Sequence, residues 1–313
     1  MTDKSMRTHY LTPCDINRSP VVIDRLLFYP ANVDRHGEGG LRMQGRFKHS
    51  LPNKPLVSIL TVVFNGAQYF EQTIQSVLNQ DYDNIEFIVI DGGSTDGTKD
   101  LLKRYEHAID YWISEPDRGI SDAFNKAVLL SSGEYLNFQG AGDLLVTRDV
   151  VSRMMLGIDP KRDMLISARV QRVRENNSDE VVWIAPRKYS PSFNKRSLLF
   201  RMSLPHQGLL TNRRMFEHYG LFDTNNIFSM DYEYLLRAYH EFPHVVMKDV
   251  LFSSWREGGI GTGRILNILN EYHRIKVKNE VAPAWILCAI DIYIKFKFKL
   301  KTIMCTKTTQ QLH

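Results

Sequence analysis

The sequence predicts an α/β fold in which a mostly parallel sheet is flanked by helices. Two continuous apolar runs, LVSILTVVF (residues 56–64) and IEFIVI (residues 85–90), are typical of strands buried on both faces. Apolar residues at helical spacing follow each run, over residues 70–78 and 101–105. Strands and helices that alternate at such short intervals indicate parallel βαβ units.

The breaks between these elements are marked by turn residues. The first strand ends at Asn65-Gly66, and the second ends at Asp91-Gly92-Gly93. Ser94 to Asp96 offer N-caps to the helix that follows. Later segments are predicted in the same way: strands over 109–114, 134–138, 164–173 and 180–185, and helices over 120–128, 213–220 and 231–240. Residues 1–54 are polar and irregular and are predicted to form an N-terminal extension.

The composition excludes several classes of protein. A chain of 313 residues with 43% hydrophobic and 24% charged residues is typical of a soluble globular protein. Its three cysteines are far apart and odd in number, which argues against a disulfide framework or a cysteine zinc site and favours a reducing compartment. The first residues lack the apolar region of a secretory signal, and no window approaches the ~18 apolar residues of a membrane span.

The positive charge is concentrated at the C-terminal end. From Arg264 onward the chain has nine basic and three acidic residues, whereas the remaining 263 residues have 31 basic and 32 acidic ones. The predicted domain is therefore neutral, and a nucleic-acid partner is not expected because it would require a basic face on that domain.

Polar loops follow all four strands of the first half. Because ligands of open α/β sheets bind beyond the carboxyl ends of the strands, these loops are expected to share one rim. Four such loops at one edge of the sheet suggest that this rim holds a polar ligand. They comprise Thr61 and Asn65, Asp91 to Asp96, Ser114 to Gly119, and Gly140 to Asp143.

The loop sequences narrow the class of ligand. DGGSTDGT (residues 91–98) is neither a GxGxxG motif nor a phosphate-binding P-loop. An aspartate at a strand end, such as Asp91, can accept hydrogen bonds from ribose hydroxyls or a base N–H. A lone carboxylate at Asp143 suits Mg²⁺ or Mn²⁺ that also binds substrate phosphates. Together these features predict a sugar-nucleotide site.

Three blocks carry a specific resemblance: residues 57–98, SEPDRGISDAFNKA (residues 114–127) and GEYLNF (residues 133–138). They resemble glycosyltransferase family 2, the inverting enzymes of Rossmann-like GT-A fold that build bacterial surface polysaccharides. The resemblance implies a GT-A domain over 55–263, with a nucleotide-binding half (55–145) and an acceptor-side half (146–263). A helical, basic segment (264–313) would follow it.

The resemblance also implies roles for single residues. Asp231 in MDYEYLLR is expected to be the catalytic base. The family usually has Asn-Ser-Asp-Asp where this chain has Gly140-Ala141-Gly142-Asp143, so Asp143 retains the metal contact for Mn²⁺ or Mg²⁺. The nucleotide-binding residues are expected to be Thr61, Asn65, Asp91, Asp117 and Asn125.

Each of these residues also has a purely structural interpretation. Asp91 could be a turn residue, Asp143 a loop aspartate, and Asp231 an acid favoured at a helix N-terminus. His206, which follows Pro205, is expected to be structural rather than catalytic. Their joint occurrence in the right order favours the functional interpretation.

The sequence thus predicts an inverting glycosyltransferase that moves a sugar from a nucleotide-sugar, a UDP-sugar by preference, to a lipid-linked saccharide acceptor in lipopolysaccharide or capsule biosynthesis. One alternative is a nucleotidyltransferase, which would need a Gly-rich basic loop that TVVFNGAQ (residues 61–68) lacks. The other is a non-catalytic sugar-nucleotide-binding protein, which the lone carboxylate of GAGD leaves open.

Residues 282–307 suggest where the protein acts. The apolar stretch from Ala284 to Ile290 is too short to span a bilayer, and four lysines then alternate with Phe296, Phe298 and Leu300. Such a segment suits the headgroup region of an anionic membrane, and it predicts a peripheral protein on the cytoplasmic face of the bacterial inner membrane. A strand edge guarded by lysines is the alternative.

Overall fold

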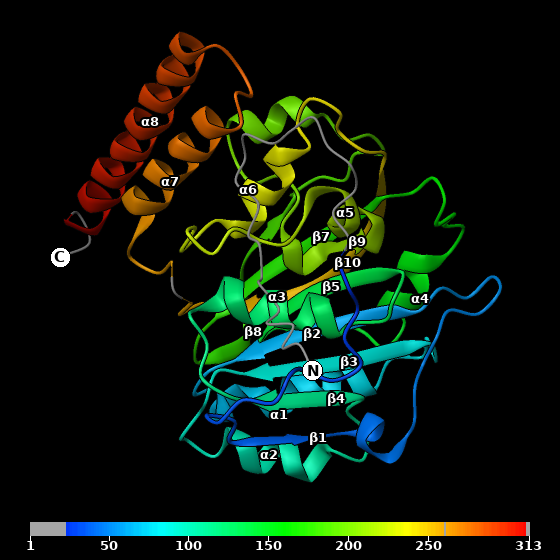
Figure 1. Cartoon of the computed structure of the whole chain (residues 1–313). Coiled ribbons are helices and arrows are strands. Elements are labelled where there is room, and N and C mark those ends of the chain that lie inside the picture. Colours follow the sequence, from blue (N-terminus) through cyan, green and yellow to red (C-terminus); the bar gives the residue numbers. More distant parts are fainter. Residues whose placement is uncertain (1–22, 260, 311–313) are drawn as a thin grey trace.

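The computed structural model describes residues 23–259 and 261–310, in which ten strands form one sheet. The strand order is β1-β4-β3-β2-β5-β9-β7-β10-β6, with β8 paired to β7 (Figure 1). The strands are β1 (Gly37–Gly39), β2 (Val57–Val63), β3 (Ile85–Asp91), β4 (Tyr111–Ser114), β5 (Tyr135–Gly140), β6 (Leu144–Leu145), β7 (Leu165–Arg174), β8 (Asn177–Ala185), β9 (Leu209–Asn212) and β10 (Val245–Arg256).

The first half is the predicted parallel sheet. Strands β4, β3, β2 and β5 are parallel neighbours, and β2 pairs with β3 along its whole length from Val57↔Ile85 to Val63↔Asp91. Helices α1 (Ala67–Leu78) and α2 (Thr98–Tyr105) cover one face, and α3 (Ile120–Leu130) packs on the other. The N-cap of α2 is Gly97 rather than a residue of 94–96, although Asp96 Oδ1 still accepts a hydrogen bond from the Thr98 N–H at 3.1 Å.

The second half of the sheet is mixed. Strand β9 runs antiparallel to both β5 and β7, and β10 is parallel to β7 and antiparallel to β6. The α/β fold with a central parallel sheet is confirmed, and antiparallel strands flank that part on both sides, β1 next to β4 and β9 next to β5. The helices of this half are α4 (Val150–Met155), α5 (Arg213–Tyr219) and α6 (Met230–Arg237), with short 3₁₀ helices η1 (Leu41–Gln44), η2 (Lys195–Leu199) and η3 (His206–Gly208).

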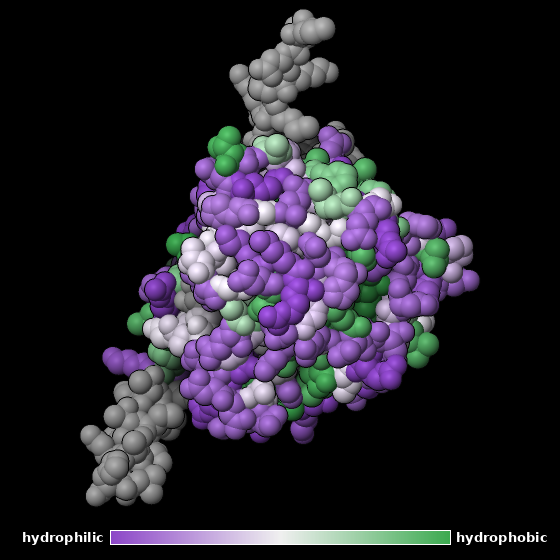
Figure 2. Space-filling view, turned by 90° about the horizontal axis from the view of Figure 1, so that it is seen from below, coloured by the Kyte–Doolittle hydropathy of each residue, from purple (hydrophilic) through white to green (hydrophobic). Residues whose placement is uncertain are grey.

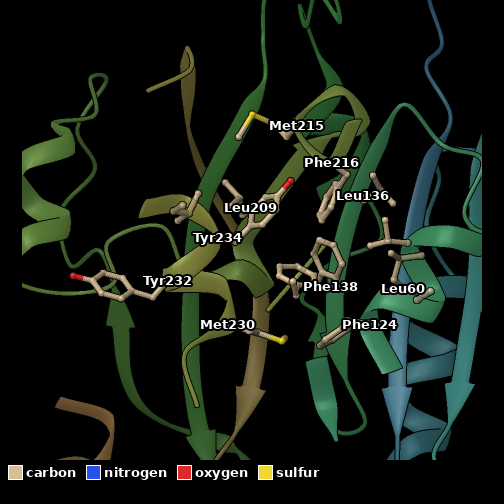
Figure 3. Close-up of a cluster of buried hydrophobic side chains, with 14 of the residues drawn as sticks. Leu60, Phe124, Leu136, Phe138, Leu209, Met215, Phe216, Met230, Tyr232 and Tyr234 are labelled. Atoms are coloured by element: carbon tan, nitrogen blue, oxygen red, sulfur yellow. The ribbon is translucent and has the colours of Figure 1, made fainter. Parts of the chain in front are cut away.

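An aromatic cluster joins the two halves (Figure 3). Phe124 of α3 meets Phe138 of β5 edge to face at 5.2 Å between ring centroids, and Phe216 of α5 stacks on Tyr234 of α6 at 4.7 Å. Each such pair contributes about 0.5–1.5 kcal/mol beyond the area it buries. The cluster therefore joins α3 and β5 of the first half to α5 and α6 of the second half.

The described part of the N-terminal extension belongs to the sheet. Strand β1 pairs antiparallel with β4, and the buried Arg42 forms an ion pair with the buried Glu86 of β3 at 2.6 Å. A side chain at Gly39 would collide with Trp112, whose Nε1 would lie 2.6 Å from the added β-carbon. The glycines that made this stretch look irregular allow the backbone to lie flat on the tryptophan ring.

The end of the molecule that carries β1 and α2 is largely hydrophilic, with hydrophobic residues in small separate groups (Figure 2). At the opposite end, α7 (Ile265–Lys278) and α8 (Ala284–Gln310) lie side by side as two helices (Figure 1). The strand-edge alternative for the lysine-rich segment is wrong: Leu287 and Ile290 of α8 are buried at helical spacing. Among the described helices, none is both long and apolar enough to cross a membrane.

Candidate active site

Asp91 joins the carboxyl ends of β3 and β4. Its buried carboxylate accepts hydrogen bonds from the Ser94 hydroxyl, from the Ser94 N–H at 3.1 Å and from Ser114 Oγ at 2.6 Å. These bonds hold the loop after β3 in one conformation. The Ser94 N–H is shared between the two carboxylate oxygens, at 3.3 and 3.1 Å, so three donors hold a group that has about four lone-pair sites.

Asn65, in the loop after β2, is bonded to the loop that follows β3. Its backbone has a positive φ of 49°, its N–H donates to Ser94 Oγ at 2.7 Å, and its side-chain oxygen accepts from the Thr95 N–H at 2.9 Å. Thr61 lies within β2, and its buried hydroxyl has no hydrogen-bond partner among the described residues. The structure thus brings Asn65 and Asp91 together, with Thr61 beneath them in the adjacent strand.

Asp117 packs directly on the loop after β3. A β-carbon added to Gly92 would lie 2.6 Å from Asp117 Oδ2, so only glycine leaves room for this carboxylate. Burial raises the pKa of Asp117, and a hydrogen bond from the Gly119 N–H at 2.8 Å partly offsets that effect. The half-buried Asp117 and the buried Asp91 therefore border one stretch of backbone at the rim.

Asn125 is held elsewhere. Its side-chain amide donates to the Phe222 carbonyl and accepts from the Phe222 N–H, both at 2.9 Å. This pair ties α3 to the segment before α6. Its predicted place in the nucleotide pocket stays a prediction, since direct contact with a nucleotide would require the amide to release Phe222.

Asp143 lies in the turn Gly140-Ala141-Gly142-Asp143. The residue is 8% exposed, and its carboxylate accepts a hydrogen bond from the Gly140 N–H at 2.8 Å. Gly142 has φ of 99°, a conformation that favours glycine, and its N–H donates to Thr73 Oγ1 of α1 at 2.9 Å. Burial raises the pKa of Asp143 to about 6, although the hydrogen bond from the Gly140 N–H and the nearby His206 act in the opposite direction.

A divalent cation would suit this carboxylate. Among the described residues no group of three His, Cys, Asp or Glu side chains forms a self-contained metal site. Mg²⁺ commonly binds through one or two carboxylates together with substrate phosphates, so one buried aspartate is sufficient on the protein side. The ionised form of Asp143 is disfavoured by burial, and a cation would relieve that cost.

Asp231 lies in the first turn of α6 and is bonded to a histidine. Its Oδ2 lies 3.0 Å from Nδ1 of His206, and its Oδ1 accepts from the Tyr232 N–H at 2.8 Å. The Asp231 side chain is 19% exposed and the His206 side chain 22% exposed. Burial lowers the pKa of His206, but the bond to Asp231 and the charges of Asp231 and Asp143 outweigh it, so the pKa is raised.

Strand β5 sets the position of this histidine. The side chain of Gln139 donates to the Gln207 carbonyl at 2.9 Å, and that of Asn137 donates to the Leu209 carbonyl at 3.0 Å. Both residues precede the Gly140–Asp143 turn on the same strand. Strand β5 therefore holds η3, which carries His206, and also leads into the turn that presents Asp143.

His206 is the functional candidate that sequence reasoning missed. It is hydrogen-bonded to the predicted base Asp231, and the charge of the predicted metal ligand Asp143 contributes to its raised pKa. The three residues are far apart in the chain, and the local sequence Pro205-His206 carries no signal of this contact. Glu233 is the other acid of the first turn of α6, but it is fully buried and bonded to Arg237 at 2.6 Å.

Comparison with known proteins decides the family. Residues 58–225 match the family model described as "Glycosyl transferase family 2". The chain is a family 2 glycosyltransferase. This glycosyltransferase is 30% identical over 190 residues to an uncharacterized glycosyltransferase of Mycobacterium tuberculosis, a match that covers 60% of this chain and 70% of the relative.

Two further relatives of this glycosyltransferase have more specific names. The putative teichuronic acid biosynthesis glycosyltransferase TuaG of Bacillus subtilis is 40% identical over 93 residues, which cover 29% of this chain and 37% of TuaG. A PGL/p-HBAD biosynthesis glycosyltransferase of Mycobacterium bovis is 26% identical over 212 residues, which cover 66% of this chain and 78% of the relative.

Solved structures confirm the GT-A type fold of this glycosyltransferase. The structure of S. aureus TarS 1–349 in complex with UDP-GlcNAc has a TM-score of 0.61 at 15% identity, over 76% of this chain and 71% of that one. The mannosyltransferase PcManGT of Pyrobaculum calidifontis, in complex with GDP-Man and Mn²⁺, has a TM-score of 0.54 at 16% identity, over 87% and 86% of the two chains.

Proposed function

We propose that this glycosyltransferase moves a sugar, with inversion, from a UDP-sugar to a hydroxyl of a lipid-linked saccharide in bacterial surface polysaccharide synthesis. The observation that carries the proposal is the arrangement of Asp143, His206 and Asp231. The carboxylate assigned to the diphosphate and the carboxylate assigned to the acceptor hydroxyl both interact with one imidazole. An inverting displacement needs its base and its leaving group to lie around one reacting carbon.

On the donor side, Asp91 and Asp117 accept hydrogen bonds from the nucleoside, and Asn65 and Thr61 complete that pocket. Support comes from their common rim and from the carboxylates they present there. The neighbour TarS was solved with UDP-GlcNAc, which favours UDP as the nucleotide.

Asp143 would hold Mn²⁺ or Mg²⁺, which when bound neutralises charge on the diphosphate leaving group. PcManGT was solved with Mn²⁺, and the buried Asp143 is the carboxylate of this chain that fits such an ion. The hydrogen bond from the Gly140 N–H at 2.8 Å holds one oxygen of the Asp143 carboxylate in place.

On the acceptor side, Asp231 removes the proton from the attacking hydroxyl. One of its oxygens is held by His206 and the other by the Tyr232 N–H, so the carboxylate is fixed in orientation while part of it remains exposed to a substrate. General bases of this kind typically contribute 10²–10⁴-fold in rate. The biosynthetic names of two relatives, for teichuronic acid and for PGL/p-HBAD, favour a cell-surface glycan as the acceptor.

The test is nucleotide release from a panel of UDP-sugars in the presence of lipid-linked acceptors. We expect one UDP-sugar to be turned over only when acceptor is present, with Asp231→Asn inactive and still able to bind UDP. Transfer without any nucleotide-sugar, or acceptor-independent binding with no turnover of any donor, would contradict the proposal.

We also propose that α8 lies on an anionic membrane at the cytoplasmic face of the inner membrane. Trp285, Ile292 and Phe296 are 74%, 69% and 60% exposed and follow one another at helical spacing, so they form one apolar stripe. Lys297 and Lys299 flank this stripe and are exposed. Rings that bury in the headgroup region between lysines that meet anionic lipid are typical of an interfacial helix.

Sedimentation with phosphatidylglycerol vesicles tests this placement. We expect the full chain to pellet at low salt and to be released at high salt, and Trp285→Ser with Phe296→Ser to reduce pelleting by roughly 10-fold or more. Leu156→Ser is a matched control, since Leu156 is also 75% exposed but lies outside α8. A full-length protein that ignores the vesicles at low salt would refute the membrane role of α8.

A further inference from the structure

The segment that precedes the family 2 match reaches the rim on which we place the nucleotide. Strand β1 runs antiparallel to β4, with Gly37 opposite Ser114 and Gly39 opposite Trp112. Residue 36 therefore lies at the carboxyl end of β4, where its N–H donates to the Ser114 carbonyl at 2.7 Å. The matched residues begin at 58, so β1 lies outside the part of the chain that the family model covers.

Arg35 fixes the loop that carries Asp117. Its guanidinium donates from Nε and one terminal nitrogen to Glu115 Oε2 at 3.0 and 2.9 Å, and from the other nitrogen to Glu38 at 2.9 Å. Glu115 is buried and is also bonded to Lys126 at 2.7 Å. Two cations on one buried carboxylate hold the start of the loop Glu115-Pro116-Asp117 at the rim.

His36 borders the other predicted nucleoside loop. A β-carbon added to Gly93 would lie 3.6 Å from His36 Cε1 and 3.4 Å from the Pro116 nitrogen, so the imidazole stands next to the loop after β3. The His36 side chain is exposed. An imidazole offers a flat face for a base to stack on and a nitrogen that can bond a base or ribose.

We propose that His36 forms the outer wall of the nucleotide pocket and contacts the nucleoside of the donor, with Arg35 as the positioning residue of that wall. This inference rests on the proposed donor site and adds to it a residue from outside the family 2 match. His36 touches the base or ribose rather than the diphosphate, because it lies at β3 and β4 whereas Asp143 follows β5, two strands away in the sheet.

Calorimetric titration with UDP and with UMP tests the contact. We expect His36→Ala to lower the affinity for UDP and for UMP by roughly 3- to 10-fold, which is the effect of one lost hydrogen bond or stacking contact. The factor should be the same for both nucleotides. His49→Ala is the matched control: His49 is an exposed histidine of the same extension whose carbonyl bonds Asn84, just before the amino end of β3, and its loss should leave both affinities unchanged.

The outcomes separate this inference from the proposed function. If the wild type binds UDP and His36→Ala binds UDP equally well, or loses affinity for UDP but not for UMP, the contact with the nucleoside is wrong while the donor site stands. If the wild type binds none of UDP, GDP, CDP and dTDP, the proposed donor site itself fails, and the inference fails with it.

Arg35 is tested by a split between kinetic constants. Arg35→Ala should raise the KM for the UDP-sugar several-fold with little change in kcat, and Arg35→Lys should restore part of the loss, because a lysine can still pair with Glu115. A general loss of folding would instead lower the thermal midpoint and reduce the active fraction without changing the KM of what remains. An unchanged KM in a folded Arg35→Ala protein overturns the positioning role.

Discussion

Replacing Asp143 by asparagine should stabilise the metal-free fold while it removes activity. Burial raises the pKa of this carboxyl from the usual 3.8 to about 6. Well below pH 3.8 the carboxyl is protonated in both the folded and the unfolded chain, so it contributes no penalty there. As the pH rises from about 4 to about 6, the unfolded chain releases the proton more readily than the folded one, and folding is progressively disfavoured.

The size of the effect follows from the two pKa values. The penalty on the wild type is about 1.5 kcal/mol at pH 5 and levels off at about 3 kcal/mol above pH 7, as an order of magnitude. The substituted asparagine would carry no charge at either pH, and its side-chain oxygen can still accept the Gly140 N–H. The charge of His206 favours the ionised form of Asp143 and is one of the effects that keep the pKa of this carboxyl from rising further.

The assay is urea denaturation of the wild type and Asp143→Asn in EDTA-containing buffer at pH 5 and pH 7.5. We expect the free energy of unfolding of the variant to exceed that of the wild type at both pH values, and by more at pH 7.5. Asp249→Asn, at a surface carboxylate that is 57% exposed, should change stability by less than about 0.5 kcal/mol. A variant that is less stable at pH 7.5, or a gain that does not change with pH, would refute the argument.

Four further predictions concern catalysis, donor binding, the metal and the core. Asp231→Asn should lower the transfer rate by about 10²–10⁴-fold with unchanged affinity for UDP; a near wild-type rate would assign the base to another residue. Asp91→Ala should weaken UDP itself by roughly 5- to 150-fold in calorimetry, the effect of about 1–3 kcal/mol for a lost buried hydrogen bond, and an unchanged affinity would remove Asp91 from the pocket. Transfer should stop in excess EDTA and recover with added Mn²⁺ or Mg²⁺; full activity in EDTA would exclude the metal role of Asp143. Arg42→Ala should lower the free energy of unfolding by about 3–5 kcal/mol because it leaves the buried Glu86 without its cation, and a loss below about 1 kcal/mol in urea denaturation would contradict this.

Local sequence patterns were sufficient for the first half of the sheet. The apolar runs at 56–64 and 85–90 became β2 and β3, and the helical spacing between them became α1. These elements follow from local pattern because a strand covered on both faces buries nearly all of its side chains, so most of them are apolar whatever packs against them. The same reasoning placed Asp91 and Asp143 in loops at one rim, since parallel strands end on one side.

The C-terminal segment shows where a local pattern misleads. Lysines and apolar residues alternate over 295–300, as in a strand, yet these residues lie in α8. The helix is decided by its other residues, because Leu287 and Ile290 are buried at a spacing that a strand could not provide. A short alternating stretch inside a longer helix has no separate preference strong enough to break it.

What the sequence by itself determined about this protein is its α/β class, the order of its strands and helices from β2 to β5, and the rim that holds its acidic residues. Only the tertiary structure decided that His206 pairs with Asp231, that the buried Glu233 forms an ion pair with Arg237, and that the extension adds β1 to the sheet. The physical reason is the range of the contacts. Periodicity reports which face of an element is buried, but a hydrogen bond between residues on separate elements depends on how those elements pack, and no local pattern encodes that packing.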